Sequence, residues 1–396
     1  MSFPATLEIP ESILHIARVL EGAGHEAWCV GGSLRDRLLG YAQSDFDVAT
    51  SATPEEVQRL FPRTVAVGIK YGTVGVLDPK RALHEVTTFR RDVQTDGRHA
   101  VVQFGVTLEE DLARRDFTIN AIAYHPLRHE WRDPFGGKED IDGRLVRAVG
   151  NSGQRFAEDY LRILRGLRFA ARFHFAIDPA TWDAARTAAP RLVHLSPERV
   201  RDEWFKGLQT ARSVTQLAAL WLKVGAAAVW IPELEIGPFV KGNVPEPPAE
   251  LRDPILLTAL FTSTPASVLR RLRASNVEID RALGMERGPE EPAGIDEPSV
   301  RKWLSAVGSS ADDLSSLWSL QRRGKEPLWL PVVREVRRRG DPLSRSDLAI
   351  TGTDLQALGA SGPRIGRTLA ALLDQVLREP SLNTREQLLE RARALQ

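Results

Sequence analysis

Hydrophobic residues follow two different spacings along the N-terminal part of the chain. Between Pro10 and Glu21 they recur at helical intervals, which predicts an amphipathic helix that ends at Gly22. The apolar positions of this helix are Ile13, Leu14, Ala17 and Leu20. The apolar run Ala27–Val30 and the segments 65–77 and 83–89 instead predict strands. Helices and strands alternate here, so we expect an α/β domain with a mixed sheet.

Two capping boxes predict further helices. Segment 53–56 supplies an N-cap threonine, a proline at the first helical position and the glutamate of the box, so a short helix should run to Phe61. Segment 107–110 is a second box and predicts a helix that ends at Arg115. Between the two helices, segment 90–100 is polar, contains a glycine and lacks an apolar period, which predicts a mobile loop.

The rest of the chain is predicted to be helical. The segment 217–229 is strongly apolar, and proline- and glycine-rich breaks at 245–248 and 288–298 interrupt the pattern. The length of the chain and these breaks predict two to four domains.

Composition narrows the class of protein. The chain has 396 residues, which is long for one compact domain, and 42% of them are hydrophobic, enough for real cores. No apolar run approaches the roughly 20 residues of a membrane span, and the N-terminus lacks a secretory pattern. The single cysteine, Cys29, excludes a disulfide framework, so we expect a cytoplasmic protein without membrane contact. The net charge of +1 means that any surface for nucleic acid must be local.

The turn after the first strand is followed by paired carboxylates. Gly31 and Gly32 would let backbone N–H groups approach a phosphate. Asp45 and Asp47 would point to one side of a strand and could hold Mg²⁺, which in nucleotidyl transfer activates a hydroxyl and stabilises pyrophosphate. The alternative is an ordinary turn beside solvated edge charges. Glu85, in a later strand, is either a third carboxylate near the metal or a strand-face charge without a catalytic part.

Two clusters of arginine and aspartate come next. Arg114 and Arg115 beside Asp116 could grip a triphosphate and a ribose hydroxyl, or could form only an ion pair at a helix end. Asp159 and Arg162 are predicted to share one face of a helix. Such a pair offers the acceptor and donors that would imitate the pairing edge of C or A, and the alternative is a surface salt bridge.

These motifs together resemble the bacterial (class II) tRNA nucleotidyltransferase, or CCA-adding enzyme, and poly(A) polymerase family. The strings that carry the resemblance are GGSLRD at 31–36, DFD at 45–47, RRDFTINA at 114–121, DPFGG at 133–137, EDYLR at 158–162 and SPER at 196–199. They stand in family order, although Leu34 occupies a position where the family normally has valine. The resemblance implies a catalytic α/β nucleotidyltransferase head at 1–150, followed by three all-α domains. These are a neck with the nucleotide-selecting helix at 151–215, a body at 216–300 and a tRNA-binding tail at 301–396.

The resemblance also implies roles for individual residues. Asp45 and Asp47 would be catalytic metal ligands. The nucleotide-binding residues that it implies are Gly32, Ser33, Arg35, Arg114, Asp116, Asn120, Asp159, Arg162 and Arg165. Asp159 and Arg162 would be the protein template that selects CTP and ATP. Segment 90–100 would be the family's loop that switches from C to A addition, and Gly136 with Gly137 would form a hinge.

The implied function is template-independent addition of CCA to tRNA from CTP and ATP, with Mg²⁺ as cofactor. Its partners would be the tRNA 3′ end and the tRNA elbow, which the glycine-flanked tail at 347–366 could anchor. Alternatives are a CC-only or A-only enzyme, then a poly(A) polymerase, and from another class a noncatalytic RNA-binding protein. Arg334 and 337–339 would attract phosphate or form a solvated face. No histidine follows His194, which excludes an HD phosphohydrolase domain.

Overall fold

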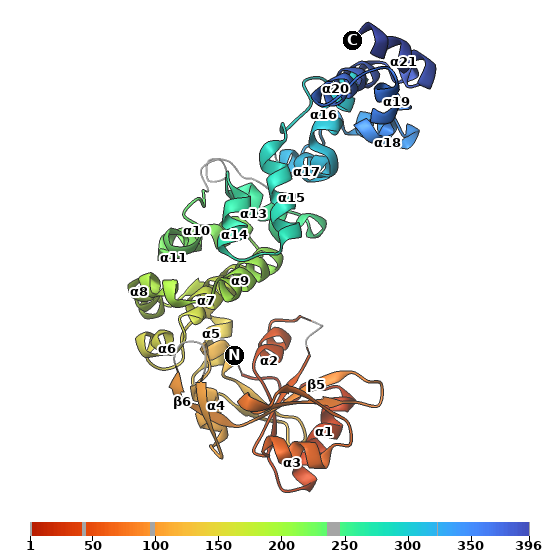
Figure 1. Ribbon diagram of the computed structural model, residues 1–396. Coiled ribbons are helices and arrows are strands. Elements are labelled where there is room, and N and C mark those ends of the chain that lie inside the picture. Colours follow the sequence, from red (N-terminus) through yellow and green to blue (C-terminus); the bar gives the residue numbers. More distant parts are fainter. Residues whose placement is uncertain (1, 42–44, 96–99, 236–245, 323, 396) are drawn as a thin grey trace. The chain divides into compact units, whose positions relative to one another are not determined.

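The computed structural model describes residues 2–41, 45–95, 100–235, 246–322 and 324–395 (Figure 1). The chain forms two compact units, Met1–Pro232 and Glu233–Gln396. Within the described ranges, none of the helices combines the length and apolarity needed to cross a membrane.

A mixed sheet of seven strands forms the centre of the first unit, in the order β3-β4-β5-β2-β1-β8-β9. Its strands are β1 (Ala27–Val30), β2 (Asp47–Thr50), β3 (Thr64–Gly68), β4 (Thr73–Leu77), β5 (Leu83–Thr88), β8 (Ala123–His125) and β9 (Glu130–Arg132). Only β2 and β5 run parallel, and the other neighbours are antiparallel. The α/β head predicted from the hydrophobic pattern is confirmed.

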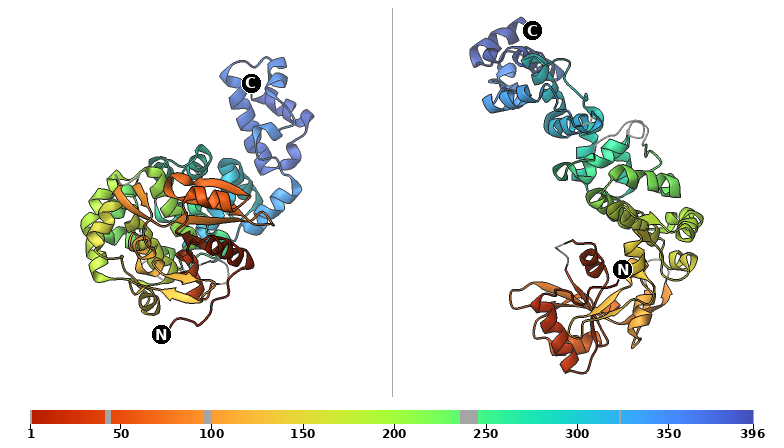
Figure 2. Two further views of the ribbon diagram at one scale, coloured as in Figure 1. Left: turned by 90° about the horizontal axis from the view of Figure 1, so that it is seen from below. Right: turned by 180° about the vertical axis from the view of Figure 1, so that it is seen from behind.

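Helices α1 (Glu11–Gly22) and α3 (Pro54–Leu60) pack against this sheet and contact each other (Figure 2). The predicted capping box of α3 is present. In α1 the buried residues include Ile16 instead of the predicted Leu14. The core below these helices also contains Cys29, which is fully buried. Burial, together with the nearby Asp47 charge, raises the pKa of this thiol well above its usual range.

The segment 90–100, which was predicted to be a mobile loop, forms the strands of a β-hairpin in its described residues. Strand β6 (Arg90–Thr95) pairs antiparallel with β7 (Ala100–Phe104), while the tip at 96–99 lies outside the described residues. The prediction was wrong because it considered only the missing helical period, whereas the dipeptide Asp96-Gly97 between Val93 and the β-branched run 101–102 is a sequence signal for a hairpin. The following helix α4 (Leu108–Ala113) has the predicted capping box but ends before Arg115.

The remainder of the first unit is helical, apart from a two-strand parallel pair, β10 (Leu145–Val146) and β11 (Ala176–Ile177). Its helices are α2 (Gly32–Leu38), α5 (Gly137–Asp142), α6 (Ser152–Glu158), α7 (Leu161–Phe173), α8 (Pro179–Ala188), α9 (Pro197–Thr210), α10 (Val214–Val224) and α11 (Ala226–Trp230). Short 3-10 turns are η1 (Ile69–Tyr71), η2 (Thr118–Asn120) and η3 (Ala189–His194). Helices α7 and α9 pack side by side, and the rings of Trp204 and Trp221 meet edge to face at 4.9 Å.

The second unit is helical throughout its described residues. Its helices are α13 (Pro254–Phe261), α14 (Pro265–Arg271), α15 (Asn276–Arg287), α16 (Glu297–Val307), α17 (Ala311–Gln321), α18 (Leu330–Arg339), α19 (Gly352–Ala357), α20 (Pro363–Arg378) and α21 (Arg385–Ala394). The helices α19, α20 and α21 enclose a hydrophobic core of their own. This agrees with the helical remainder that the sequence predicts.

Candidate nucleotide-binding site

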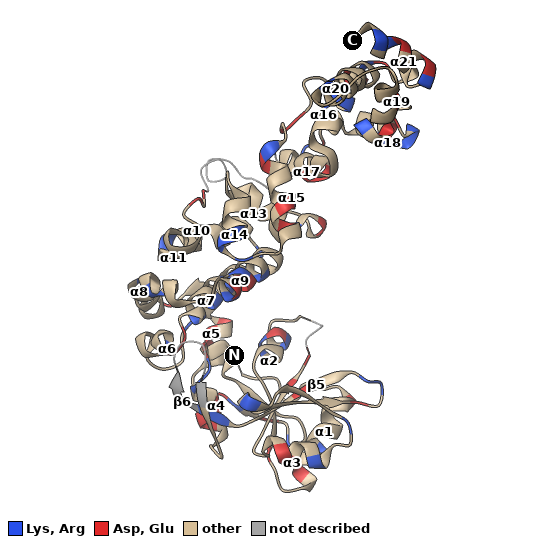
Figure 3. Ribbon diagram, in the orientation of Figure 1, with Lys and Arg blue, Asp and Glu red and all other residues tan. Residues whose placement is uncertain are grey.

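A cavity of about 690 Å³ lies in the first unit, lined by strands of the sheet, α2, α7 and α9. Its walls carry ten cationic and four acidic side chains, an excess that suits a triphosphate. The cations are Arg35, Arg90, Arg114, Arg115, Arg162, Arg165, Arg168, Arg172, Arg199 and Lys206, and the acids are Asp47, Glu85, Asp116 and Asp159. Basic segments on α7 and α9 are coloured blue in Figure 3.

Helix α7 supplies a stripe of four arginines to this cavity. They are Arg162, Arg165, Arg168 and Arg172. Their spacing of three or four residues puts them on one helix face, while the apolar residues between them face the core. Arg162 and Arg165 were predicted from the sequence, whereas Arg168 and Arg172 were not. Their spacing of three and four residues from Arg165 onward could have revealed them. Arg168 donates to Glu203 of α9 at 2.7 Å, and Arg172 donates to Asp36 of α2 at 2.9 Å.

Asp47 and Glu85 lie side by side on one face of the sheet. The parallel register aligns Val48 with Val86, so the residues just before them also stand next to each other. Asp47 stays open to solvent on one side, and the loss of solvent on its other sides raises its pKa to about 6. The charges of Glu85 and Asp45 add to the rise, whereas Arg115 opposes it. A divalent cation would relieve this concentration of negative charge, so the donor set fits a metal ion.

Asp45 and Ser33 do not line the cavity. Asp45 is exposed and precedes β2, which begins at Asp47, whereas Phe46 and Val48 are buried on the opposite side as predicted. The Ser33 hydroxyl is buried and donates to the Val30 carbonyl at 3.3 Å. Among the described residues, no three Asp, Glu, His or Cys side chains come close enough to hold a metal ion by themselves. A bound ion would therefore need oxygens from water or substrate as well.

Both arginines of the RRD string bind a carboxylate other than the predicted one. Arg114 donates to Asp111 at 2.8 and 3.0 Å, and Arg115 donates to the other oxygen of Asp111 at 3.2 Å. Asp116 is instead buried and accepts hydrogen bonds from Arg165 at 2.7 Å, from the Asn120 amide at 2.9 Å and from a backbone N–H. Burial alone would raise the pKa of Asp116, but these donors lower it to about 2.

The same network orients Arg35. Its guanidinium donates to both Asn120 Oδ1 and Asp36 Oδ1, the latter at 2.7 and 2.9 Å. It also lies over the rings of Phe169 and Phe173, at 4.9 and 4.7 Å from their centres. Because these contacts hold the side chain on several sides, its remaining donors have a defined direction in the cavity wall.

Asp159 and Arg162 both line the cavity, but they do not share a helix face. Asp159 has extended backbone and lies between α6 and α7, so the single helix predicted across EDYLR was wrong. Asp159 accepts a hydrogen bond from Arg199 at 2.7 Å, while Arg162 donates to Glu158 at 2.7 Å and to the Arg114 carbonyl at 3.1 Å. The alternative, a salt bridge between Asp159 and Arg162, is not present among the described residues either, because their ionic partners are Arg199 and Glu158.

Gly137 begins helix α5 in a tightly packed position, whereas Gly136 before it is the N-cap residue and has open space beside it. Asp133 accepts hydrogen bonds from the N–H groups of Gly137 and Lys138 at 2.7 and 2.8 Å. A Cβ atom on Gly137 would lie 2.2 Å from the Thr118 carbonyl oxygen. Glycine is therefore required here for close packing, and a hinge motion remains a prediction.

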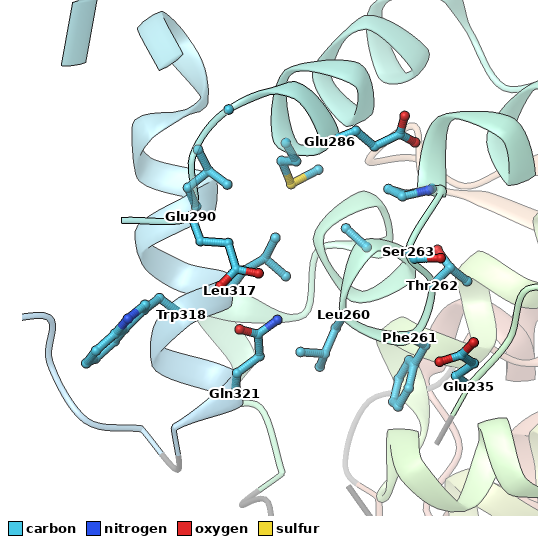
Figure 4. Close-up of a pocket in the computed structure, with 15 residues that line it drawn as sticks. Glu235, Leu260, Phe261, Thr262, Ser263, Glu286, Glu290, Leu317, Trp318 and Gln321 are labelled. Atoms are coloured by element: carbon cyan, nitrogen blue, oxygen red, sulfur yellow. The ribbon is translucent and has the colours of Figure 1, made fainter. Parts of the chain in front are cut away.

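Two features of the second unit carry no sign of nucleotide binding. The basic run on α18 is neutralised, because Arg337, Arg338 and Arg339 form ion pairs with Asp312, Glu335 and Glu297 at 2.6 to 2.8 Å, which favours a solvated face. A cavity of about 370 Å³ (Figure 4) has no lysine or arginine among its described lining residues. Its charged residues are Glu235, Glu286 and Glu290, which would repel phosphate.

Comparisons with known proteins agree on one family. The family model "Poly A polymerase head domain" matches residues 27–147, and "Probable RNA and SrmB- binding site of polymerase A" matches 174–236. The CCA-adding enzyme of Geobacillus kaustophilus (strain HTA426) is 36% identical over 397 residues, which span 96% of this chain and 95% of the relative. That of Streptococcus mutans serotype c is 47% identical over 201 residues, half of each chain.

Solved structures give the same result. The crystal structure of the Bacillus stearothermophilus CCA-adding enzyme in complex with CTP has a TM-score of 0.77 at 32% identity and covers 97% of this chain and 98% of its own. The Thermotoga maritima CCA-adding enzyme complexed with tRNA_CCA shares the fold, with a TM-score of 0.62 at 19% identity over 96% and 94% of the two chains. This protein therefore belongs to the CCA-adding enzyme family of nucleotidyltransferases.

Proposed function

We propose that this protein adds C, C and A in turn to the 3′ end of tRNA, using CTP and ATP and no nucleic-acid template. The observation that carries the proposal is that Asp47 and Glu85 line the same cavity as the stripe of arginines on α7. A full-length relative at 36% identity is a CCA-adding enzyme, and a similar solved structure holds CTP. The tRNA substrate and the single buried cysteine support a cytoplasmic location.

The arginines bind the triphosphate in this proposal. Arg35 and Arg165 are oriented by carboxylates, so their free N–H donors point in defined directions before the nucleotide arrives. Asp116 and Asn120 are linked by a hydrogen bond and bind the ribose hydroxyls. Such prior orientation lowers the entropic cost of binding the flexible phosphate chain. Gly32 leaves room beside Arg35, and Ser33 anchors the turn through its hydroxyl.

Asp159 and Arg162 select the base. Asp159 offers an acceptor and Arg162 offers donors, and other residues hold each of them, so neither is neutralised by the other. A wrong base would leave buried donors or acceptors unsatisfied, which costs about 1–3 kcal/mol for each group. That cost is the physical basis for rejecting GTP and UTP.

Asp45 and Asp47 would hold Mg²⁺ together with oxygens of water and substrate, and Glu85 lies next to Asp47 in the neighbouring strand. When bound, the metal lowers the pKa of the attacking hydroxyl and stabilises the charge on the phosphates. The chain's own part is to collect negative charge at the beginning of β2 and to place arginines in the same cavity. The division into head, neck, body and tail remains part of the proposal, with the N-terminus of α20 after Gly362 as an anchor for the tRNA elbow.

Stepwise incorporation tests the function. The protein is incubated with tRNA that ends at the discriminator base, at C or at CC, with CTP and ATP separately and together, and the products are resolved on a sequencing gel. CCA addition predicts two C residues with CTP alone, one A on the CC acceptor with ATP, and the complete end with both nucleotides. Products that stop at CC with saturating ATP would favour the CC-only alternative, and an untemplated run of A would favour a poly(A) polymerase.

A further inference from the structure

An exposed apolar surface lies on the same face of the sheet as the catalytic carboxylates. The register puts Gly75 opposite Glu85 and Val65 opposite Gly75, so this face continues from the carboxylate to the edge strand β3. Val65, Val67 and Leu83 on this surface are 43%, 44% and 45% exposed. We call these three residues the edge strip.

Gly75 makes the edge strip continuous. The Leu83 Cδ1 and Val67 Cγ2 atoms lie 2.6 and 2.8 Å from the place where a Cβ of Gly75 would be, so both side chains close over the glycine. Neighbouring strands are about 4.8 Å apart, so the strip begins about one strand spacing from Glu85 and extends for about one more. This length is comparable with one or two stacked nucleotides.

Cationic side chains border the edge strip. Arg63, Lys70, Lys80 and Arg81 are exposed, and none of them forms an ion pair within the described part of the chain. The basic turn between β4 and β5 is visible in blue in Figure 3. Asp78 is the only acidic residue between 62 and 84, and its carboxylate interacts with two neighbours on its own hairpin. The border can therefore attract a polyanion.

We infer that the edge strip holds the terminal nucleotides of the acceptor RNA strand, an inference that rests on the proposed function. In-line displacement needs the attacking 3′-hydroxyl on the side of the α-phosphate opposite the leaving pyrophosphate. In the sheet, β5, β4 and β3 extend to one side of Asp47, whereas α7 packs on α6, α9, α10 and the β10–β11 pair. The triphosphate is bound by the arginines of α7, so the acceptor strand arrives on the side of β3, where the edge strip is. The bases pack on Val65, Val67 and Leu83, and the bordering cations meet the phosphates.

A second copy of this chain fits the edge strip less well. Two copies would bring four unpaired cations against another four. The edge strand β3 has only five residues, and its register shifts between Val65 and Gly68. Short and irregular edge strands discourage pairing with another sheet.

The test uses a triple variant, Val65→Thr, Val67→Thr and Leu83→Gln, in the full chain. Val193→Thr is the matched control, because Val193 is 61% exposed in η3 and does not line the cavity. Initial rates of C addition are measured while tRNA and CTP are varied in turn. We expect the KM for tRNA to rise about tenfold in the triple variant, with the KM for CTP and kcat within about twofold of wild type. The control should match the wild type.

A second measurement uses an acceptor whose terminal nucleotide lacks its base. The wild type should show a raised KM for this acceptor. In the triple variant the KM should rise little further, because the missing base and the three substitutions remove the same contact. The inference would be overturned if the triple variant and the missing base raised the KM for the acceptor independently, so that their effects multiplied. A raised KM for CTP in the variant, or a change from dimer to monomer, would also overturn it. A wild type that adds no nucleotide would refute the proposed function itself, whereas an active wild type with an unaffected triple variant would refute only the edge strip.

Discussion

Replacing Asp116 with asparagine tests how strongly the proposed ribose site is tied to α7. Arg165, Asn120 and the Phe117 N–H all donate to the buried Asp116 carboxylate, and its pKa is about 2 against an ordinary value of 3.8. A difference of nearly two units corresponds to about 2.5 kcal/mol of stability. Because the pKa is lower in the folded protein, this stabilisation is complete above pH 3.8 and is lost as the pH falls towards 2.

We expect Asp116→Asn to lower the free energy of unfolding by about 2 kcal/mol at pH 7, because the Arg165 charge loses its nearest acidic partner and keeps only the more distant Glu203. The difference from the wild type should shrink as the pH falls through 4 towards 2. Amide hydrogen exchange of α7 peptides is the suitable assay, because it reports on the first unit alone. The control is Asp202→Asn, whose exposed ion pair with Arg201 should contribute less than about 1 kcal/mol. Unchanged protection at pH 7, or a difference that does not vary with pH, would refute the reasoning.

Four other variants test the remaining assignments. Asp47→Ala should abolish incorporation of every nucleotide while the Kd for tRNA, measured by filter binding, stays within about twofold; substantial turnover would contradict the metal assignment. Arg162→Ala should slow the reaction and also raise the kcat/KM for UTP and GTP relative to CTP and ATP, whereas a loss of speed alone would indicate a structural role. Gly137→Ala should lower the free energy of unfolding by about 2 kcal/mol or more in a thermal melt, since its Cβ would overlap the Thr118 carbonyl, and an unchanged melt would show that this contact relaxes freely. A variant that lacks residues 92–99 should give products that stop at CC on a sequencing gel. If this variant completed CCA, the hairpin would not be needed for the addition of A.

Local patterns in the sequence were sufficient for the elements that depend on local contacts. The spacing of α1 and the capping box of α3 were predicted because both arise within one or two helical turns. Most of the residues that the family resemblance implied, including Asp47, Arg35 and Asp116, line one cavity. Their individual roles stay predictions, because proximity in a cavity does not show which atom of the substrate each one touches.

The errors have both local and distant causes. The β6–β7 hairpin is a local element, and it was missed because only the helical period was considered and the Asp96-Gly97 turn signal was not. The RRD string suggested a pairing of neighbours, yet the arginines bind Asp111 and Asp116 binds Arg165, 49 residues away. At the helix break, Asp159 accepts a local hydrogen bond from the Leu161 N–H at 3.0 Å and a distant one from Arg199 of α9 at 2.7 Å. The pairs of Asp116 with Arg165 and of Asp159 with Arg199 are set by tertiary packing, which local propensity does not predict.

The burial of Cys29 has a practical consequence for chemical labelling. The chain has one cysteine, and its thiol is inaccessible and held protonated beneath the sheet. Maleimides and other thiol reagents act on the exposed thiolate, so the unaltered protein should remain unmodified under native conditions. A single cysteine introduced at an exposed site such as Val193 would then be the one reactive position. A fluorophore or spin label could thus be attached to the intact protein without removing any native residue.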